Sequence, residues 1–229
     1  MQGDLTDRSK TEMQFKEKDT RKKIAKIVFL KKWEEINTNV FLKLLLGESY
    51  MKIAIGVVAL LILALILFLF HAGFFTTVTV QEKTVGPYTL VYEEFQGDYK
   101  NTPTVQDKIY YALLKEYKIE TFKGFGIYYD NPQQVPKEKL RSEIGCILEE
   151  KDLSKVEELK AKQFKIKEFP KTEAIVVEFP FNTQFSIFAG IMKVYPKLEV
   201  FRKEHNYQTR EVMEIYDVPS KKILYISLK

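Results

Sequence analysis

The sequence predicts an α+β protein in which two βαββ units pair into one antiparallel sheet, with helices on one side, a central cleft between the units and one transmembrane helix ahead of them. Three observations support this fold class. The segment Gly126–Pro132 (GIYYDNP) returns later in the chain as Met213–Pro219 (MEIYDVP). Around each copy the residues follow the order strand, helix, strand, turn, strand. Before both copies, Ile53–Phe70 (IAIGVVALLILALILFLF) contains no charged residue.

The apolar run at Ile53–Phe70 is long enough to cross about 27 Å of hydrocarbon as a helix. A cleaved signal peptide is the alternative, but the run exceeds the usual apolar core of such peptides, and residues 70–73 (FHAG) are a poor cleavage site. The basic residues Lys31, Lys32, Lys43 and Lys52 precede the run closely, whereas Lys83 alone follows it soon after. We therefore expect a single-pass protein of the cell membrane, held in the lipid bilayer with its amino terminus cytoplasmic and its folded domain extracytoplasmic.

We divide the chain into residues 1–50, a transmembrane anchor at 51–73 and a folded domain at 74–229. The first part is basic and is expected to be partly disordered or amphipathic. Residues 1–20 are polar, whereas Arg21–Leu46 places apolar residues at helical spacing among lysines, as in helices that lie on an anionic membrane surface. The alternative is that this part precedes the true start of the protein, because Met51 and Lys52 directly before an apolar run resemble the start of an ordinary signal-anchored protein.

Charge and composition exclude several classes of function. Residues 1–50 carry 11 Lys and Arg against 8 Asp and Glu, and the remaining residues carry 25 against 23. A nearly neutral folded domain without a clustered basic face predicts that nucleic acid is not a partner. One cysteine and two histidines provide no metal site of useful spacing, and we expect no cofactor. The oligomeric state is left open.

The elements of the folded domain can be placed in order along the chain from strand and helix periodicity and from turn residues. The first unit is expected to contain a strand or stalk at Thr76–Gln81, a strand at Tyr88–Phe95, a helix at Thr104–Tyr117, and strands at Lys123–Tyr129 and Leu140–Leu148. The second is expected to contain a strand at Ala174–Phe179, a helical pattern at Ser186–His205 broken near Pro196, and strands at Val212–Tyr216 and Ile223–Leu228. Between them, the charged stretch Leu153–Lys165 is expected to be a surface connection with a short helix. Neither unit can bury its sheet face and its helix alone, so the two should form one sheet.

The repeated motif also suggests which side chains share a face of the sheet. Side chains alternate along a strand, so Glu214 and Tyr216 point one way while Met213 and Ile215 point toward the helices. If the two copies superpose, the first copy contributes Phe125, Ile127 and Tyr129 to the same face as Glu214. We expect Tyr129 and Tyr216 to line the cleft between the units.

The pattern Gly126-x-Tyr128-Tyr129-Asp130-x-Pro132, then Leu140-Arg141-x-Glu143, then Glu214-x-Tyr216-x-x-Pro219 resembles the GyrI-like superfamily of small-molecule-binding domains. This superfamily includes the effector-binding domains of AraC-type and MerR-type regulators. The resemblance covers roughly residues 76–229 and implies a duplicated βαββ fold. A transmembrane helix directly before such a domain also resembles the arrangement in reticulophagy receptors of this superfamily. The regulators bind DNA through a separate module, so transcriptional control is not implied.

The resemblance implies a ligand site. In members that bind lipophilic cations, a carboxylate on the strand that corresponds to the last copy lies among aromatic rings, and Glu214 matches that position. We therefore expect the domain to bind small amphipathic molecules, cationic ones included. The candidate ligand-binding residues are Glu214, Tyr216, Tyr129, Tyr92, Ile127 and Phe125. Arg141 could neutralise Glu143 or Glu214 when no ligand is present.

Other interpretations remain open from the sequence. Glu214 could serve as the general base of a hydrolase that acts on a strained or electrophilic small molecule, with no further catalytic residue recognisable. The domain could instead be a membrane-tethered protein-interaction module with an exposed apolar patch. Outside the resemblance, Glu214 is more simply a solvated strand residue or half of a structural salt bridge.

Overall fold

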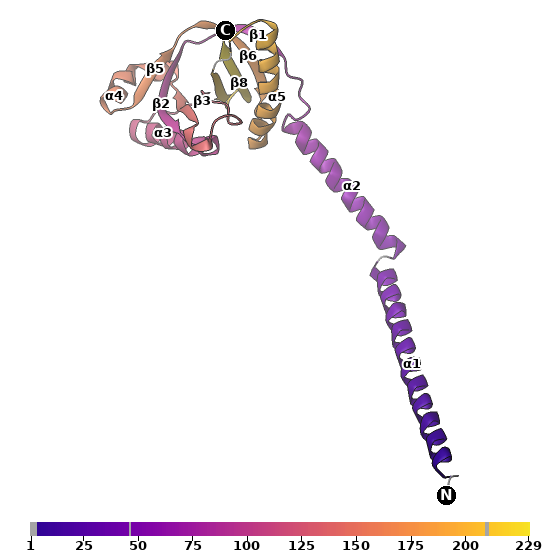
Figure 1. Ribbon diagram of the computed structural model, residues 1–229. Helices are drawn as coiled ribbons and strands as arrows, with labels where there is room; N and C mark the ends of the chain where they lie inside the picture. The colour runs from indigo at the N-terminus through magenta and orange to yellow at the C-terminus, as the bar shows by residue number, and fades with distance from the viewer. Residues whose placement is uncertain (1–3, 46, 209–210) are drawn as a thin grey trace. The chain divides into compact units, whose positions relative to one another are not determined.

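The computed structural model describes residues 4–45, 47–208 and 211–229 (Figure 1). It divides into two compact units, Met1–Ala64 and Leu65–Lys229. The first unit contains helix α1 (Asp4–Leu45) and most of helix α2 (Glu48–His71). The second contains the last turns of α2 and the whole folded domain.

Helix α2 contains the predicted membrane span. Residues Tyr50–His71 are long and apolar enough to cross a membrane, by length and composition, and none of that stretch is buried in the structure. An apolar helix of a soluble core would be buried, so this stretch is not a core helix. A signal sequence near the amino terminus can pass the same test of length and composition.

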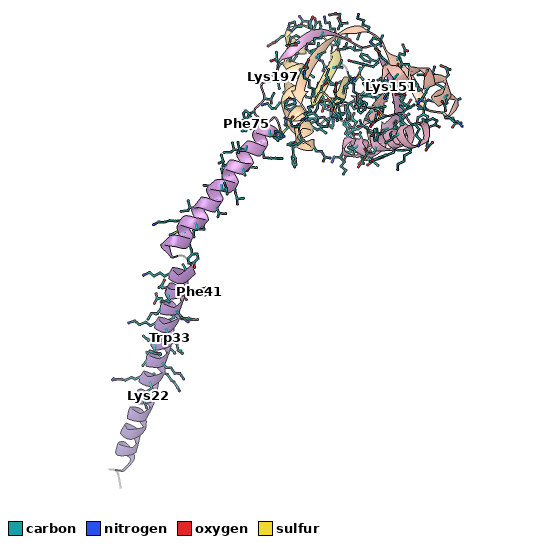
Figure 2. The ribbon with its side chains drawn as sticks, turned by 180° about the vertical axis from the view of Figure 1, so that it is seen from behind. Lys22, Trp33, Phe41, Phe75, Lys151 and Lys197 are labelled. Atoms are coloured by element: carbon teal, nitrogen blue, oxygen red, sulfur yellow. The ribbon has the colours of Figure 1, made fainter. Side chains whose placement is uncertain are left out.

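Helix α1 runs through the segment for which the sequence predicts partial disorder. It begins at Asp4, and residues 1–3 lie outside the described part of the chain. Its frequent Lys and Glu residues have good intrinsic helix propensity, which accounts for a helix where low apolar content alone indicates disorder. The side chains of Lys22, Trp33 and Phe41, labelled in Figure 2, project from this helix.

The folded domain is built on one curled antiparallel sheet of eight strands in the order β1-β6-β8-β7-β3-β4-β2-β5. Its strands are β1 (Val80–Val85), β2 (Tyr88–Gln96), β3 (Lys123–Tyr128), β4 (Arg141–Ile147), β5 (Lys165–Phe169), β6 (Thr172–Pro180), β7 (Val212–Asp217) and β8 (Lys222–Leu228). The duplication is confirmed: β2, helix α3 (Thr102–Tyr117), β3 and β4 form one βαββ unit, and β6, helix α5 (Gln184–Glu204), β7 and β8 form the other. The units join where β3 pairs with β7.

The helices α3 (Thr102–Tyr117) and α5 (Gln184–Glu204) lie on the same face of the sheet, as predicted. Ile109 and Leu113 of α3 pack on Val91 and Cys146 of the first unit. From α5, Val194 and Leu198 pack against the second unit, in a cluster with Ile175 and Tyr225. The short helix α4 (Val156–Ala161) precedes β5. Because each helix covers its own unit, the central strands β3 and β7 lie between them.

The opposite face of the sheet curls around a second core. Its buried members come from both units and are Val85, Leu90, Phe125, Ile127, Ile147, Ala174, Val176, Met213, Ile215 and Ile226. The strands are thus apolar on both faces, which explains why runs such as Ala174–Phe179 show no clear alternation of polar and apolar residues.

Three elements differ from the sequence expectation. The first strand lies at Val80–Val85, not Thr76–Gln81, because its pairing with β6 sets its position. Strand β5 was not predicted, since its charged sequence KIKEF is typical of a solvated connection. Helix α5 continues through Pro196, although a break was expected there. Pro196 and Met192 are exposed, so the carbonyl that loses its partner at Pro196 lies on the solvent side of the helix.

Candidate functional site

Glu214 lies in β7 near the middle of the helix-covered face. It pairs with Gly126 of β3 on one side and with Tyr225 of β8 on the other. Residues directly opposite each other in antiparallel strands share a face, so all three point toward the helix layer. Glu214 is 2% exposed. A carboxyl group this deeply buried is uncommon and needs hydrogen-bond partners.

Two tyrosine hydroxyls satisfy the Glu214 carboxylate. Tyr195 Oη, from α5, donates to Oε1 at 2.7 Å, and Tyr216 Oη, two residues along β7, donates to Oε2 at 2.5 Å. Burial raises the pKa of the Glu214 carboxyl above its usual value, and the two hydroxyls act against that rise. In the described part of the chain, no lysine or arginine forms an ion pair with Glu214. The ionised carboxylate therefore has donors but no counter-charge.

Two further tyrosines complete a group that we call the Glu214 cluster: Glu214, Tyr128, Tyr195, Tyr216 and Tyr225. Burial, followed by the charge of Glu214, raises the pKa of each of these four tyrosines. The Tyr225 side chain is fully buried, and its hydroxyl has no hydrogen-bond partner among the described residues. Tyr128, Tyr195 and Tyr216 are only half-buried, so their rings form the outer layer above the carboxylate.

Gly126 makes room for this arrangement. A Cβ atom there would come within 2.8 Å of the Tyr128 ring, which folds back across the glycine. The Tyr128 ring also meets Tyr99 edge-on, with centroids 4.8 Å apart. Beside Tyr216 lies Phe181, at a centroid distance of 5.8 Å. Aromatic rings from both units therefore surround the carboxylate, which suits a flat or aromatic ligand.

The structure separates the predicted site residues into two groups. Glu214 and Tyr216 lie together, as expected, but toward the helices and not away from them. Phe125 pairs with Ile215, and Ile127 pairs with Met213, so both point into the core on the opposite face. The prediction that they share a face with Glu214 is wrong. The motif alignment equates Ile127 with Glu214, but the pairing register makes Gly126 the counterpart, and a shift of one residue moves every side chain to the other face.

Tyr92 and Tyr129 also belong to the opposite face. Tyr92 packs against the core that contains Phe125. Burial and the neighbouring Glu143 carboxylate raise the pKa of Tyr129. Glu143 forms an ion pair with Lys167, whose Nζ lies 5.0 Å from the centroid of the Tyr92 ring. These tyrosines thus surround a carboxylate that already has a cation.

Arg141 does not neutralise either glutamate. Its guanidinium binds the Asp130 carboxylate, with an Nη2–Oδ1 distance of 2.8 Å, and holds the pKa of that carboxyl below its usual value. Asp130 also accepts from the Arg141 backbone amide at 2.8 Å. The pair therefore stabilises the connection between β3 and β4.

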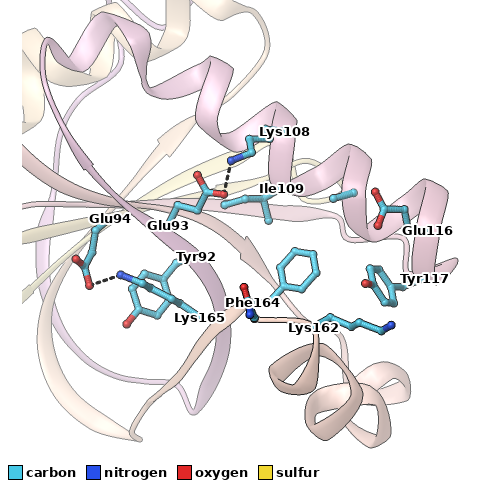
Figure 3. Close-up of a pocket in the computed structure, with 12 residues that line it drawn as sticks. Tyr92, Glu93, Glu94, Lys108, Ile109, Glu116, Tyr117, Lys162, Phe164 and Lys165 are labelled. Atoms are coloured by element: carbon cyan, nitrogen blue, oxygen red, sulfur yellow. Dashed lines mark hydrogen bonds and ion pairs between the residues drawn. The ribbon is translucent and has the colours of Figure 1, made fainter.

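A groove of about 540 Å³ lies along β2, α3 and β5, away from the Glu214 cluster (Figure 3). Its apolar floor includes Ile109 and Phe164, and Tyr92 lies at one end. Two ion pairs lie at this groove, Lys108 with Glu93 and Lys165 with Glu94, at 2.7 and 2.9 Å, and Glu116 and Lys162 also line it. The members of these two pairs neutralise each other's charge, whereas the Glu214 carboxylate forms no ion pair with a described residue.

Sequence reasoning missed Tyr128, Tyr195 and Tyr225. A signal for Tyr128 was present, because Gly126-x-Tyr128 has the same spacing as Glu214-x-Tyr216, and aligning these two places both tyrosines on one face. Tyr195 is brought to the cluster by helix packing, for which the sequence carries no comparable signal. No group of three metal-binding side chains occurs among the described residues.

The family model described as a GyrI-like small molecule binding domain matches residues 79–224, more than half of the chain. The chain belongs to the GyrI-like family. The family resemblance predicted from the repeated motif is therefore confirmed, and the matched region runs from just before β1 into β8.

Two curated relatives are mammalian. The testis-expressed protein 264 homolog of Mus musculus is 32% identical over 153 residues, which are 64% of this chain and 48% of that protein. Testis-expressed protein 264 of Homo sapiens is 29% identical over 168 residues, which are 70% and 52% of the two chains. This chain thus spans about half the length of the curated relatives it matches.

Similar solved structures include an EcmrR–DNA complex and SAV2435 bound to tetraphenylphosphonium. The EcmrR chain is 14% identical with a TM-score of 0.47, and the match covers 65% of this chain and 56% of that one. The SAV2435 chain is 8% identical with a TM-score of 0.42, and the match covers 65% and 92%.

Proposed function

We propose that this GyrI-like domain binds small amphipathic molecules, lipophilic cations in particular, with Glu214 as the counter-charge, and that α2 anchors it in a membrane. The observation that carries the proposal is a carboxylate 2% exposed, bound by two tyrosine hydroxyls and, among the described residues, by no cation. An ionised carboxylate out of water loses several kcal/mol of solvation, and two hydroxyl donors restore only part of it. An organic cation placed beside the carboxylate supplies the remaining stabilisation.

The tyrosines give the site its selectivity. Aromatic faces attract organic cations, and this attraction strengthens when water is excluded. Because Tyr195 and Tyr216 cover both carboxylate oxygens, a ligand reaches Glu214 only when at least one of these rings rotates outward. Both rings are partly exposed to solvent, so this rotation is into water and not into the core. Binding therefore replaces one hydrogen bond between a tyrosine and Glu214 by an ion pair with the cation. The displaced tyrosine ring then offers a face on which the ligand can stack.

The membrane anchor fits the same proposal. Helix α2 has the length and composition of a span, and basic residues concentrate before it, which favours a cytoplasmic amino terminus and an extracytoplasmic domain. Amphipathic molecules partition into bilayers. An anchored domain would therefore meet them at a higher local concentration than a free one.

The test compares two ligands of one shape and opposite charge. The full chain in lipid nanodiscs is titrated calorimetrically with tetraphenylphosphonium and, separately, with tetraphenylborate, and the heat of partitioning into empty nanodiscs is subtracted. We expect the cation to bind at least about tenfold more tightly, which corresponds to about 1.4 kcal/mol. Equal affinities, or a preference for the anion, would contradict the counter-charge role of Glu214.

A further inference from the structure

The amino-terminal half of α5 carries an unusual apolar surface. Phe185, Phe188, Ile191 and Met192 are each between 44 and 58% exposed, and we call them the α5 stripe. Their spacing places them on one side of the helix. The opposite side, with Ala189 and Val194, packs into the domain core. Four large apolar side chains in adjacent turns of one surface helix are typical of a binding surface.

The α5 stripe is continuous with the end of α2. Within the second unit, the Phe68 ring of α2 meets Phe185 edge-on at a centroid distance of 5.3 Å, and Phe74 lies 6.4 Å from Phe188. Polar contacts fix the same junction. Asn182 Nδ2 donates to the His71 carbonyl at 2.9 Å, and Lys193 Nζ donates to the Phe74 carbonyl at 2.6 Å.

We propose that the α5 stripe is a membrane-interface surface, which inserts into the headgroup region of the bilayer that α2 spans. This inference rests on the proposed anchoring by α2. If α2 crosses the membrane, its last turns lie at the boundary between hydrocarbon and headgroups, and the side chains that contact those turns lie at nearly the same depth. Exposed Phe75, directly after the span, extends the apolar surface.

A lipid surface fits this stripe for two reasons. Aromatic and aliphatic side chains on one side of a helix, with lysines beside them, are the composition of helices that lie in the membrane interface. Lys197 follows the stripe on α5, where its cationic group is within reach of lipid phosphates; Figure 2 labels Phe75 and Lys197. Tyr195, which covers Glu214, follows Ile191 by one turn. Contact with lipid would therefore place the ligand site close to the bilayer.

The experiment uses the full chain with its single tryptophan removed by Trp33→Phe. A new tryptophan is introduced by Phe188→Trp, and the protein is reconstituted in vesicles of phosphatidylcholine and phosphatidylserine in a four to one ratio. Some vesicles contain lipids with a doxyl quencher near the headgroup, and others contain a quencher deep in the acyl chain. Tyr111→Trp, at an exposed position on α3, is the matched control. Leu60→Trp, in the middle of α2, reports on anchoring independently.

We expect the shallow quencher to reduce the emission of the Phe188→Trp variant several-fold more than that of the Tyr111→Trp variant. The deep quencher should act on Leu60→Trp. Deep quenching at position 60 without shallow quenching at position 188 overturns the interface proposal while anchoring stands. No quenching at position 60 removes the anchoring and the interface proposal together. Equal quenching at positions 188 and 111 shows non-specific contact with lipid. An emission shift at position 188 that lipid quenchers do not affect shows a protein partner. Either result also overturns the proposal.

Discussion

Replacing Glu214 by glutamine is expected to weaken tetraphenylphosphonium binding by about 30-fold or more, equivalent to about 2 kcal/mol, the low end of the cost of breaking a buried charge pair. Glutamine keeps the shape of the side chain and one acceptor oxygen, and it removes the negative charge. Its NH2 group can only donate, so the tyrosine hydroxyl that faces it must turn and accept. The loss therefore measures the electrostatic contribution. Tetraphenylborate should bind no more weakly to the variant than to the wild type, because its repulsion by the carboxylate is removed.

Glu143→Gln is the matched control for this measurement. Glu143 is also a partly buried carboxylate near tyrosines, but it lies on the opposite face of the sheet and forms an ion pair with Lys167. Its removal should leave tetraphenylphosphonium affinity nearly unchanged. If Glu143→Gln weakened binding and Glu214→Gln did not, the site would lie on the face that contains Tyr92 and Tyr129.

Gly145→Ala is expected to lower the melting temperature by about 10 °C, which corresponds to a loss of about 3 kcal/mol in a domain of this size. A Cβ atom at Gly145 would lie 1.9 Å from the carbonyl oxygen of Val91 and 2.9 Å from Cα of Tyr92. Both atoms belong to the backbone of β2, so no side-chain rotation relieves the clash. The strand itself would have to move, and the curl of the sheet around its inner core would change.

Gly124→Ala is the control for this prediction. It tests whether any side chain added to a glycine of the central strands destabilises the domain to the same extent. The nearest obstruction at Gly124 is the end of the Gln106 side chain, at 1.5 Å, which can rotate away. We expect this variant to lose less than about 1 kcal/mol in thermal melts of the full chain in detergent. Similar melting temperatures for the two variants would show that β2 does not need its close approach to β4.

Much of this fold could be predicted from the sequence because it depends on patterns among residues that are close together in the chain. The repeated Tyr-Asp-x-Pro turn marks the end of the same strand in each unit, and the apolar face of Thr104–Tyr117 identifies a helix without reference to its neighbours. The charge-free run before the domain marks the possible span in the same way. Glu214 could be singled out because a charged residue in an otherwise apolar strand requires an explanation.

The parts that could not be predicted depend on register and on tertiary packing. A motif alignment fixes which residues are related by duplication only to within one position, and one position is enough to reverse the face of a strand. For that reason the motif predicts the wrong face for Phe125 and Ile127 and does not single out Tyr128. Tyr195 comes from helix α5, and its contact with Glu214 of β7 is made only when that helix packs on the sheet of its own unit.

The most direct test of the counter-charge role is the affinity of the full chain for tetraphenylphosphonium as a function of pH. This cation has a fixed charge, so any pH dependence comes from the protein. Burial raises the pKa of Glu214 above 4.5, and the ligand requires the ionised form. Affinity should be highest above the raised pKa and should fall as pH drops through it, approaching a tenfold loss per pH unit. Glu214→Gln should show weak binding without this dependence. A wild-type curve that is flat through the acidic range, or one that the Glu214→Gln variant reproduces, would show that the cation does not bind against this carboxylate.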